Sequence, residues 1–289
     1  MDEFKKNMVR STGMRVFIYL MALLVCSLIG GALTLWLAAG NDIVKLKIGQ
    51  AVSSFLIFVA PPLILYGFTR PKPFQAIGFR KPFNGWLLLI GVALMFVSLP
   101  LTNWLTTVNE KMTLGTAFES LETMLQQMEE AAGDLTDRML QVDTLPGLLF
   151  NLLVIALIPA LGEELTFRGV LQQALVKGCK NAHVGIWLSA ALFSFIHFQF
   201  YGFLPRMFLG IILGYMFYYS GSLWTSILMH FVNNGTAVVV AYLEQKGLTE
   251  VEPDQFGATD NLVWVIVSVV ATVALIVLSR LIKQKYGRK

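Results

Sequence analysis

The sequence predicts an all-α, polytopic membrane protein, a bundle of about eight transmembrane helices with both termini in the cytoplasm. Hydrophobic residues make up 56% of the 289 residues and charged residues only 14%, whereas a typical globular chain is roughly 45–50% apolar and about 25% charged. The apolar residues are gathered in runs of about 20, the length that spans a hydrocarbon layer of ~30 Å. Positive charges occupy alternate loops between these runs. We therefore interpret residues 1–289 as a single membrane domain.

Eight long apolar runs are the candidate membrane spans. Pro61 and Pro62 interrupt the second run and Pro100 the third. A proline inside a helix predicts a kink, and it leaves carbonyl groups that need partners from neighbouring helices. In the sixth run Gly210 and Gly214 form a GxxxG pair, which favours close helix packing. The runs cover residues 16–39, 47–68, 86–107, 146–175, 183–201, 203–220, 222–243 and 262–282.

The distribution of lysine and arginine predicts the orientation, because these cations are retained on the cytoplasmic side of a membrane. Four cation-rich segments should therefore be cytoplasmic, and they contain Lys5, Lys6, Arg10, Arg15, Arg70, Lys72, Arg80, Lys81, Lys177, Lys180, Arg280, Lys283, Lys285, Arg288 and Lys289. By contrast, residues 108–145 hold eight acidic and two basic side chains, and residues 244–261 hold five acidic and one basic. These two segments are predicted to lie outside.

The predicted extracytoplasmic loop, residues 108–145, contains an amphipathic stretch within residues 114–132. Its apolar residues are spaced by four and three positions, as on one face of a helix, and they are Leu114, Phe118, Leu121, Leu125 and Met128. The other positions include Glu119, Glu122, Glu129 and Glu130. The pattern predicts a surface helix that rests on the bundle or on lipid headgroups. A gate or a partner-binding element is the alternative.

Polar and ionisable side chains are concentrated in three of the apolar runs. They occur at residues 162–168 (GEELTFR), 193–197 (FSFIH) and 230–234 (HFVNN). An ionisable side chain in a membrane span costs roughly 2.5–3.5 kcal/mol even on the lenient insertion scale. A lone histidine or a Glu–Arg pair is usually a packing or clamping feature, but apolar residues would pack three helices at lower cost. The conjunction therefore favours a functional site.

The spacing predicts which of these side chains lie together. Glu164 and Arg168 are four residues apart, so on a helix they share one face and can pair. Glu163 lies about 100° further round the axis, so its carboxylate can stay unpaired and face the interior of the bundle. The same one-turn spacing predicts two further neighbouring pairs, His230 with Asn234 and Phe193 with His197.

The ordered motifs EExxxR, FxxxH and HxxxN span residues 163–234 and resemble the three-motif signature of the CPBP family. That family comprises the type II CAAX prenyl endopeptidases and their bacterial relatives, including proteins linked to bacteriocin processing and self-immunity. The resemblance implies an intramembrane endopeptidase whose catalytic core helices cover residues 146–243. It also implies a bacterial host, and hence the inner (cytoplasmic) membrane. Because prenylated tails are not expected there, the expected partners are a peptide or membrane-protein substrate and the lipid bilayer.

The same resemblance implies a role for each motif residue. Glu163 would be the general base that takes a proton from water, and His197 would orient that water. His230 and Asn234 would donate hydrogen bonds to the developing oxyanion. No cofactor is expected in this scheme. The residues that would support the site are Glu164, Arg168 and Phe193.

One alternative keeps the protease function and assigns the motif residues to a metal. Two histidines and one carboxylate can hold a catalytic zinc ion, and the ligands would then be Glu163, His197 and His230. The chain has no HExxH helix, and Asn234 is more suitable as a neutral donor than as a zinc ligand. We therefore expect the metal-free glutamate mechanism, with zinc as the alternative.

A second alternative belongs to another class, a non-catalytic immunity factor or a proton-coupled transporter. Intramembrane Glu and His can serve a proton relay, but a relay needs titratable groups and the Asn234 amide does not titrate. A nucleic-acid partner is not expected, because the cations flank apolar runs and form no stripe with aromatic residues.

Overall fold

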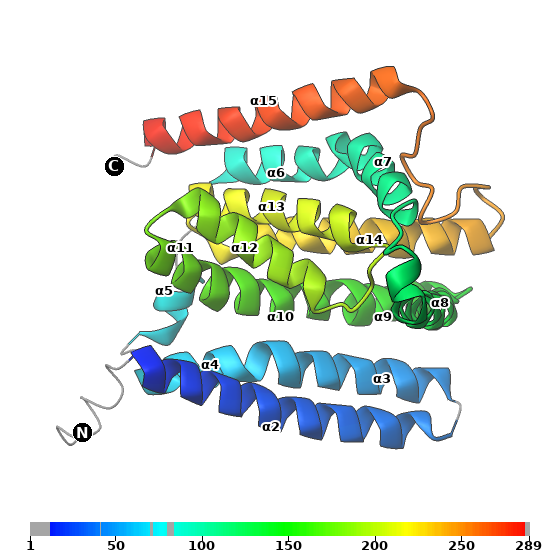
Figure 1. Ribbon diagram of the computed structural model, residues 1–289, viewed down its shortest axis with the longest axis horizontal. Helices are drawn as coiled ribbons and strands as arrows, with labels where there is room; N and C mark the ends of the chain where they lie inside the picture. The colour runs from blue at the N-terminus through cyan, green and yellow to red at the C-terminus, as the bar shows by residue number, and fades with distance from the viewer. Residues whose placement is uncertain (1–11, 41, 70–71, 80–83, 287–289) are drawn as a thin grey trace.

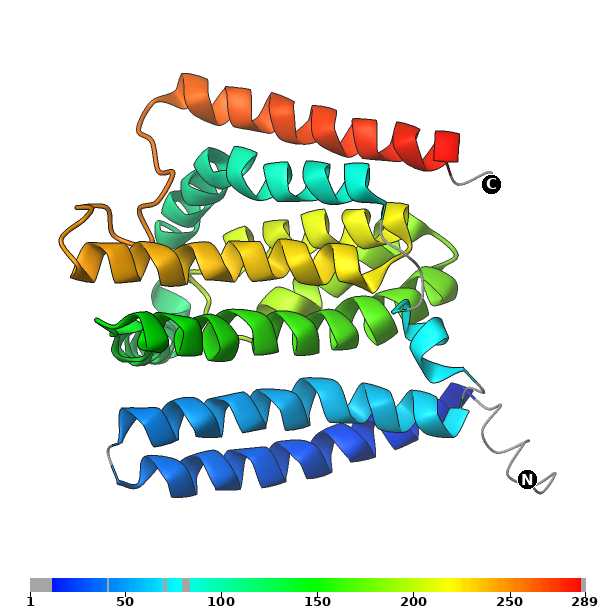
Figure 2. The ribbon, with the colours of Figure 1, turned by 180° about the vertical axis from the view of Figure 1, so that it is seen from behind.

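The computed structural model describes residues 12–40, 42–69, 72–79 and 84–286, and within these ranges it contains helices and loops but no β-strand. The predicted all-α class is confirmed. In Figure 1 the long helices run nearly parallel, in layers from α2 at one edge to α15 at the other. The view from behind in Figure 2 shows the same layers, with α14 in front of the central helices.

Each of the eight predicted spans corresponds to a helical segment of the described chain. Five segments are long and apolar enough to cross a membrane by themselves, and a sixth is the bent pair of α6 and α7. The remaining two are α12, with only 14 residues, and α13, whose 18 residues include an arginine and three tyrosines. The segments are α2 (Thr12–Ala38), α3 (Ile43–Ser54) with η1 (Phe55–Val59) and α4 (Ala60–Thr69), α6 (Gly85–Val97) with α7 (Leu99–Glu110), α9 (Leu145–Asn151) with η3 (Leu152–Leu157), α10 (Ile158–Thr166), η4 (Phe167–Gln172) and α11 (Gln173–Cys179), α12 (Ala182–Phe195), α13 (Phe203–Ser220), α14 (Leu223–Gln245) and α15 (Leu262–Tyr286).

The outermost helices α2 and α15 present large apolar side chains to the surroundings. Leu35, Trp36 and Val270 are 76%, 72% and 63% exposed, respectively. Apolar exposure on this scale over whole helices is compatible with lipid and not with water. The chain is an integral membrane protein with a polytopic helical bundle.

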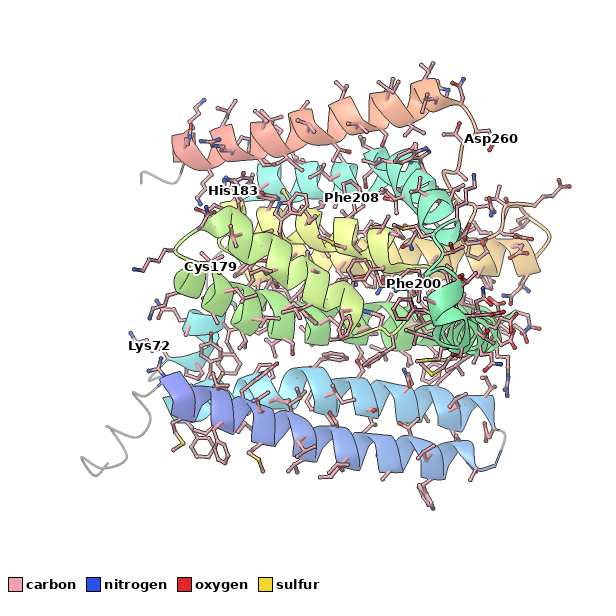
Figure 3. All side chains as sticks on the ribbon, in the orientation of Figure 1. Lys72, Cys179, His183, Phe200, Phe208 and Asp260 are labelled. Carbon is pink, nitrogen blue, oxygen red and sulfur yellow. The ribbon has the colours of Figure 1, made fainter. Side chains whose placement is uncertain are left out.

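The two ends of the bundle agree with the predicted alternation of loops. The start of α2 and the end of α15 lie at the same end (Figure 1). In Figure 3 Lys72 and Cys179 are at this end, whereas Asp260 is at the other. Of the predicted cytoplasmic cations, those outside the described residues are Lys5, Lys6, Arg10, Arg70, Arg80, Lys81, Arg288 and Lys289.

The prolines produce breaks for which neighbouring helices supply hydrogen bonds, as predicted. Pro62 cannot donate to the carbonyl of Phe58, and the Thr166 hydroxyl donates to that carbonyl instead, at 2.8 Å. The π-helical turn η1 ends at Val59, with Ala60 between it and this proline pair. At Pro100 the helix breaks by 45° between α6 and α7. There the Ser268 hydroxyl of α15 donates to the Val97 carbonyl at 2.7 Å.

The amphipathic helix forms, but its limits differ from the prediction. Helix α8 (Glu119–Leu140) begins after the 3₁₀ turn η2 (Thr116–Phe118), so Leu114 and Phe118 are outside it. Figures 1 and 2 show α8 nearly end-on while the spans run across the view, so it crosses one end of the bundle. Along its apolar face Leu125 is half-buried, whereas Leu121 and Met128 are 43% and 38% exposed. Glu129 also reaches the protein, as described below.

Candidate active site

The three motif segments meet in the centre of the bundle. Helix α10 packs against α14, and η4, which continues α10, packs against α12 and α13. The EExxxR motif occupies the junction of α10 and η4, so Arg168 lies on a π-helical turn and both glutamates lie on regular helix. Single π-helical turns of this kind are frequent at functional sites.

Glu164 and Arg168 form a fully buried ion pair, as the one-turn spacing predicts. Arg168 Nη1 donates to Glu164 Oε1 at 2.7 Å, and the two side chains are 1% and 0% exposed. Arg168 Nη2 donates to the carbonyl of Gly210 on α13 at 2.9 Å. The pair therefore joins the helix that carries the EExxxR motif to the GxxxG face of α13.

His230 bridges the two adjacent carboxylates. Its Nδ1 lies 2.9 Å from Glu164 Oε1, and its Nε2 lies 3.8 Å from Glu163 Oε2. Because the Arg168 partner favours the ionised form of Glu164, the carboxylate accepts and His230 Nδ1 carries the proton. In the tautomer with its proton on Nδ1, His230 presents the lone pair of Nε2 toward Glu163. The sequence did not predict the contact with Glu164, which joins residues 66 positions apart.

The Phe193 ring lies at the centre of the cluster. Its centroid is 5.2 Å from that of His197 and 5.9 Å from that of His230, both edge-to-face, and the Arg168 guanidinium carbon lies 5.0 Å above it. The predicted packing of Phe193 beside His197 is confirmed. Both imidazoles therefore lie against one aromatic ring.

His197 is not on a transmembrane helix, contrary to the predicted span 183–201. Helix α12 ends at Phe195, and the N–H groups of His197 and Phe198 bond to carbonyls only three residues back. Phe198 has φ +53°, a left-handed conformation that terminates the helix. The His197 ring is held by a 2.8 Å contact between Nδ1 and the Phe193 carbonyl. A loop thus positions this histidine next to the buried cluster.

Asn234 lies one turn beyond His230 on α14, as predicted. Its Oδ1 accepts a hydrogen bond from Asn233 Nδ2 at 3.2 Å. Because an amide has separate donor and acceptor atoms, this bond orients the Asn234 side chain and leaves its own NH₂ group available for another acceptor.

Three polar residues outside the motifs stabilise the π-helical turn. Tyr66 from α4 donates to the Gly169 carbonyl at 2.9 Å, and Gln173 donates to the same oxygen at 2.8 Å. Gln172 donates to the Gly214 carbonyl at 3.0 Å. The GxxxG pair of α13 predicts a close approach of backbones, and this is the sequence feature that could have indicated the contact with Gln172. The carbonyls of Gly210 and Gly214 accept hydrogen bonds from Arg168 and Gln172, respectively.

Arg206 on α13 is a further cation beside the site that the sequence reasoning missed. It donates to Gln199 Oε1 at 2.7 Å. It also interacts electrostatically with Glu163 and His197. Nothing in the local pattern distinguishes Arg206 from a loop-flanking cation.

The described residues do not form a ready metal site. No group of three His, Cys, Asp or Glu side chains among them is close enough to hold an ion. Glu163 and His230 are adjacent, and the Nδ1 of His197 contacts a backbone carbonyl, which leaves its Nε2 as the atom that could bind a metal. Glu163, His197 and His230 would hold a zinc ion only if they lay closer together than they do among the described residues.

Comparison with known proteins agrees with this geometry. Residues 145–236, which contain α9 to most of α14 and all three motifs, match the family described as type II CAAX prenyl endopeptidase Rce1-like. The chain contains an Rce1-like domain. The Rce1-like domain includes every motif residue discussed above, and the resemblance inferred from the motifs is confirmed.

The chain is also similar to part of one curated protein. The chain is 27% identical over 104 residues to the uncharacterized protein YpbD of Bacillus subtilis (strain 168). The alignment covers 35% of this chain and 48% of that relative, so the chain spans about half the length of the protein it matches. No solved structure matches the chain. The family match supports an intramembrane protease of the CAAX type in general.

Proposed function

We propose that this protein is an intramembrane endopeptidase that hydrolyses a peptide bond with a water activated by Glu163. The observation that carries the proposal is the contrast between two adjacent carboxylates. Glu164 is bonded to Arg168 and His230, whereas no hydrogen bond within the described residues reaches Glu163, whose side chain is 12% exposed. A carboxylate in the bundle interior without a structural partner is suited to accept a proton.

In the proposed reaction Glu163 takes a proton from water, and the hydroxide attacks the substrate carbonyl carbon. His197, next to the cluster on its loop, orients the water. The carbonyl oxygen becomes an oxyanion that accepts a hydrogen bond from the Asn234 amide. Collapse of the intermediate breaks the C–N bond, and the leaving amine takes up the proton.

The contact between Glu164 and His230 refines the role of His230. With the Nδ1 proton directed to Glu164, Nε2 can donate to the oxyanion only after it has received a proton. Glu163 lies 3.8 Å away and is a possible source of that proton. The buried Glu164 carboxylate would stabilise the resulting imidazolium. In this scheme His230 donates to the oxyanion and then helps to protonate the leaving amine.

A comparison of cellular protein termini tests the proposal. Membrane proteomes of cells that carry the wild-type protein or Glu163→Ala should differ in peptide termini that appear only with the wild type. Glu130→Gln, an exposed change on α8, is the matched control and should retain those termini. Identical termini in all three strains, at equal protein levels, would remove the protease assignment and favour an immunity factor or a transporter.

Metal analysis separates the two protease schemes. Purified active protein should contain no stoichiometric zinc, and chelation should leave its activity intact. Stoichiometric zinc whose removal and return reversibly switch activity off and on would overturn the metal-free mechanism. In that case Glu163, His197 and His230 would be reassigned as ligands.

A further inference from the structure

A cavity of about 370 Å³ is lined by residues of α6, α7, α8, α13 and α14. One wall is a face of α7, where Ser98, Thr102 and Thr106 recur at intervals of four and Glu110 follows at the rim. The 45° break at Pro100 tilts this helix away from the line of α6 (Figure 1). The volume lies within the 300–1,000 Å³ range of ligand sites.

Two residues link the cavity to the site. Arg206 lines the cavity and interacts electrostatically with Glu163 and His197. Asn233 also lines it and donates to Asn234 at 3.2 Å. A ligand in the cavity would therefore contact Arg206 and Asn233, each of which interacts with a motif residue. A second cavity of about 160 Å³ shares Asn233 and Leu99, so the space extends along α14.

The lining of the cavity extends to Glu110, the last residue of α7. Asp260 and Cys179 lie at opposite ends of the bundle (Figure 3). Glu129 of α8 lies on its wall and accepts a hydrogen bond from the Tyr201 N–H at 3.2 Å. Glu110 is exposed at the end of α7. The surroundings are strongly acidic, since the segments 108–145 and 244–261 hold thirteen acidic and three basic side chains in total.

We infer that this cavity is the substrate-binding site, and that it takes an apolar peptide segment with basic flanking residues from the extracytoplasmic side. The inference rests on the proposed protease function. Apolar residues on the walls, such as Leu99 and Leu209, suit an apolar stretch. The acidic rim attracts cations and repels acidic peptides, and it raises the local concentration of the former.

Thiol accessibility tests the side of entry without requiring activity. Thr106→Cys places a thiol on the wall in the full-length protein, with Cys26→Ala as the background. Native Cys179, exposed at the opposite end, and Asp260→Cys report the two membrane sides. A membrane-impermeant maleimide should label Thr106→Cys and Asp260→Cys in intact cells and Cys179 in inside-out vesicles. Labelling of Thr106→Cys only together with Cys179 would overturn the inference.

Protection by peptides tests the chemistry of the ligand. A synthetic apolar peptide flanked by lysines should slow labelling of Thr106→Cys about tenfold more than the same peptide flanked by glutamates, in the range of electrostatic focusing. The difference should shrink in high salt. Glu110→Gln should reduce the difference in protection between the two peptides. The control Asp137→Asn, two turns beyond Glu129 on α8, should leave that difference unchanged. Equal protection by both peptides would contradict the proposed charge preference.

Protection assays in the Glu163→Gln protein separate this inference from the proposed function. Protection by the lysine peptide without its cleavage by wild-type protein would support the binding site and remove the protease function. Cleavage of that peptide without protection of Thr106→Cys would support the protease and overturn the cavity assignment.

Discussion

The two faces of α10 place adjacent carboxylates in different surroundings. On one face Glu164 is fully buried and bonded to Arg168 and His230. On the other face Glu163 is 12% exposed and 3.8 Å from His230 Nε2. Both glutamates bear the cost of an ionisable group in a membrane, but the cost of Glu164 is offset by its partners and that of Glu163 is not. The difference separates a structural carboxylate from one available for chemistry.

The largest effect is expected from Glu163→Gln. An isosteric amide cannot take the proton from water, so kcat should fall by about 10²–10⁴. The melting temperature should stay near that of the wild type, because no described hydrogen bond to Glu163 is lost. Peptide turnover by purified protein and its thermal unfolding in mild detergent are the two measurements. Retained turnover by a folded Glu163→Gln protein would remove this residue from the base role.

Glu164→Gln should show the opposite pattern, with stability as the main loss. Neutralising one member of a buried pair leaves Arg168 uncompensated, which costs about 3–5 kcal/mol. Thermal unfolding should show a large fall for Glu164→Gln and almost none for the exposed Glu130→Gln. Adding Arg168→Met to Glu164→Gln should recover part of the stability, because it removes the unpaired charge. A wild-type melting temperature for Glu164→Gln would show that the Glu164–Arg168 ion pair does not stabilise the fold.

The sequence predicts the contacts that depend on local spacing. Each apolar run corresponds to a helical segment, of which five or six are long and apolar enough to cross a membrane. The four-residue interval predicts the Glu164–Arg168 pair, because a helix brings such positions together without reference to the rest of the fold. It could not predict the contact of His230 with Glu164, which depends on how α14 docks against α10. The missed Arg206 is a similar case, since only the tertiary fold brings α13 to Glu163.

The sequence errors also have physical causes. The apolar run 183–201 continues through His197, but the chain leaves the helix after Phe195, and hydrophobicity alone does not reveal a left-handed turn at Phe198. On α8 the periodicity is that of an amphipathic helix, but the inward side also includes Glu129, which accepts from the Tyr201 N–H. Leu140, beyond the predicted stretch, packs against Val238 and Ala241. The local periodicity does not reveal such tertiary partners.

Asn234→Ala tests whether the Asn234 amide donates a hydrogen bond to the oxyanion. Removal of one such donor lowers kcat by about 10²–10³, and KM should change little if the donor acts mainly in the transition state. Asn233→Ala is the matched control on the same turn, and it should lower kcat only about fivefold, the value of one ordinary hydrogen bond. Full steady-state kinetics of both variants make the test. Near-normal kcat for Asn234→Ala would favour a proton relay over an oxyanion site.

The smallest effect is expected from a change at Gly210 on α13, whose carbonyl accepts a hydrogen bond from Arg168. A Cβ added at Gly210 would lie 3.0 Å from Ala190 Cβ and 3.1 Å from its Cα. Since a helix backbone cannot yield as a flexible side chain can, α12 and α13 must separate slightly, at a cost of about 1–3 kcal/mol.

The same separation would draw the Gly210 carbonyl away from Arg168 Nη2, now 2.9 Å distant. Gly210→Ala should therefore lower both the melting temperature and, more weakly, kcat. Adding Ala190→Gly, which removes the opposing methyl group, should restore both, since the backbones could approach again. Gly31→Ala on α2, where an added Cβ meets nothing within 4 Å, should not destabilise the protein, because alanine is the better helix former. If Ala190→Gly fails to rescue Gly210→Ala, the close contact of α12 and α13 does not hold Arg168 in position.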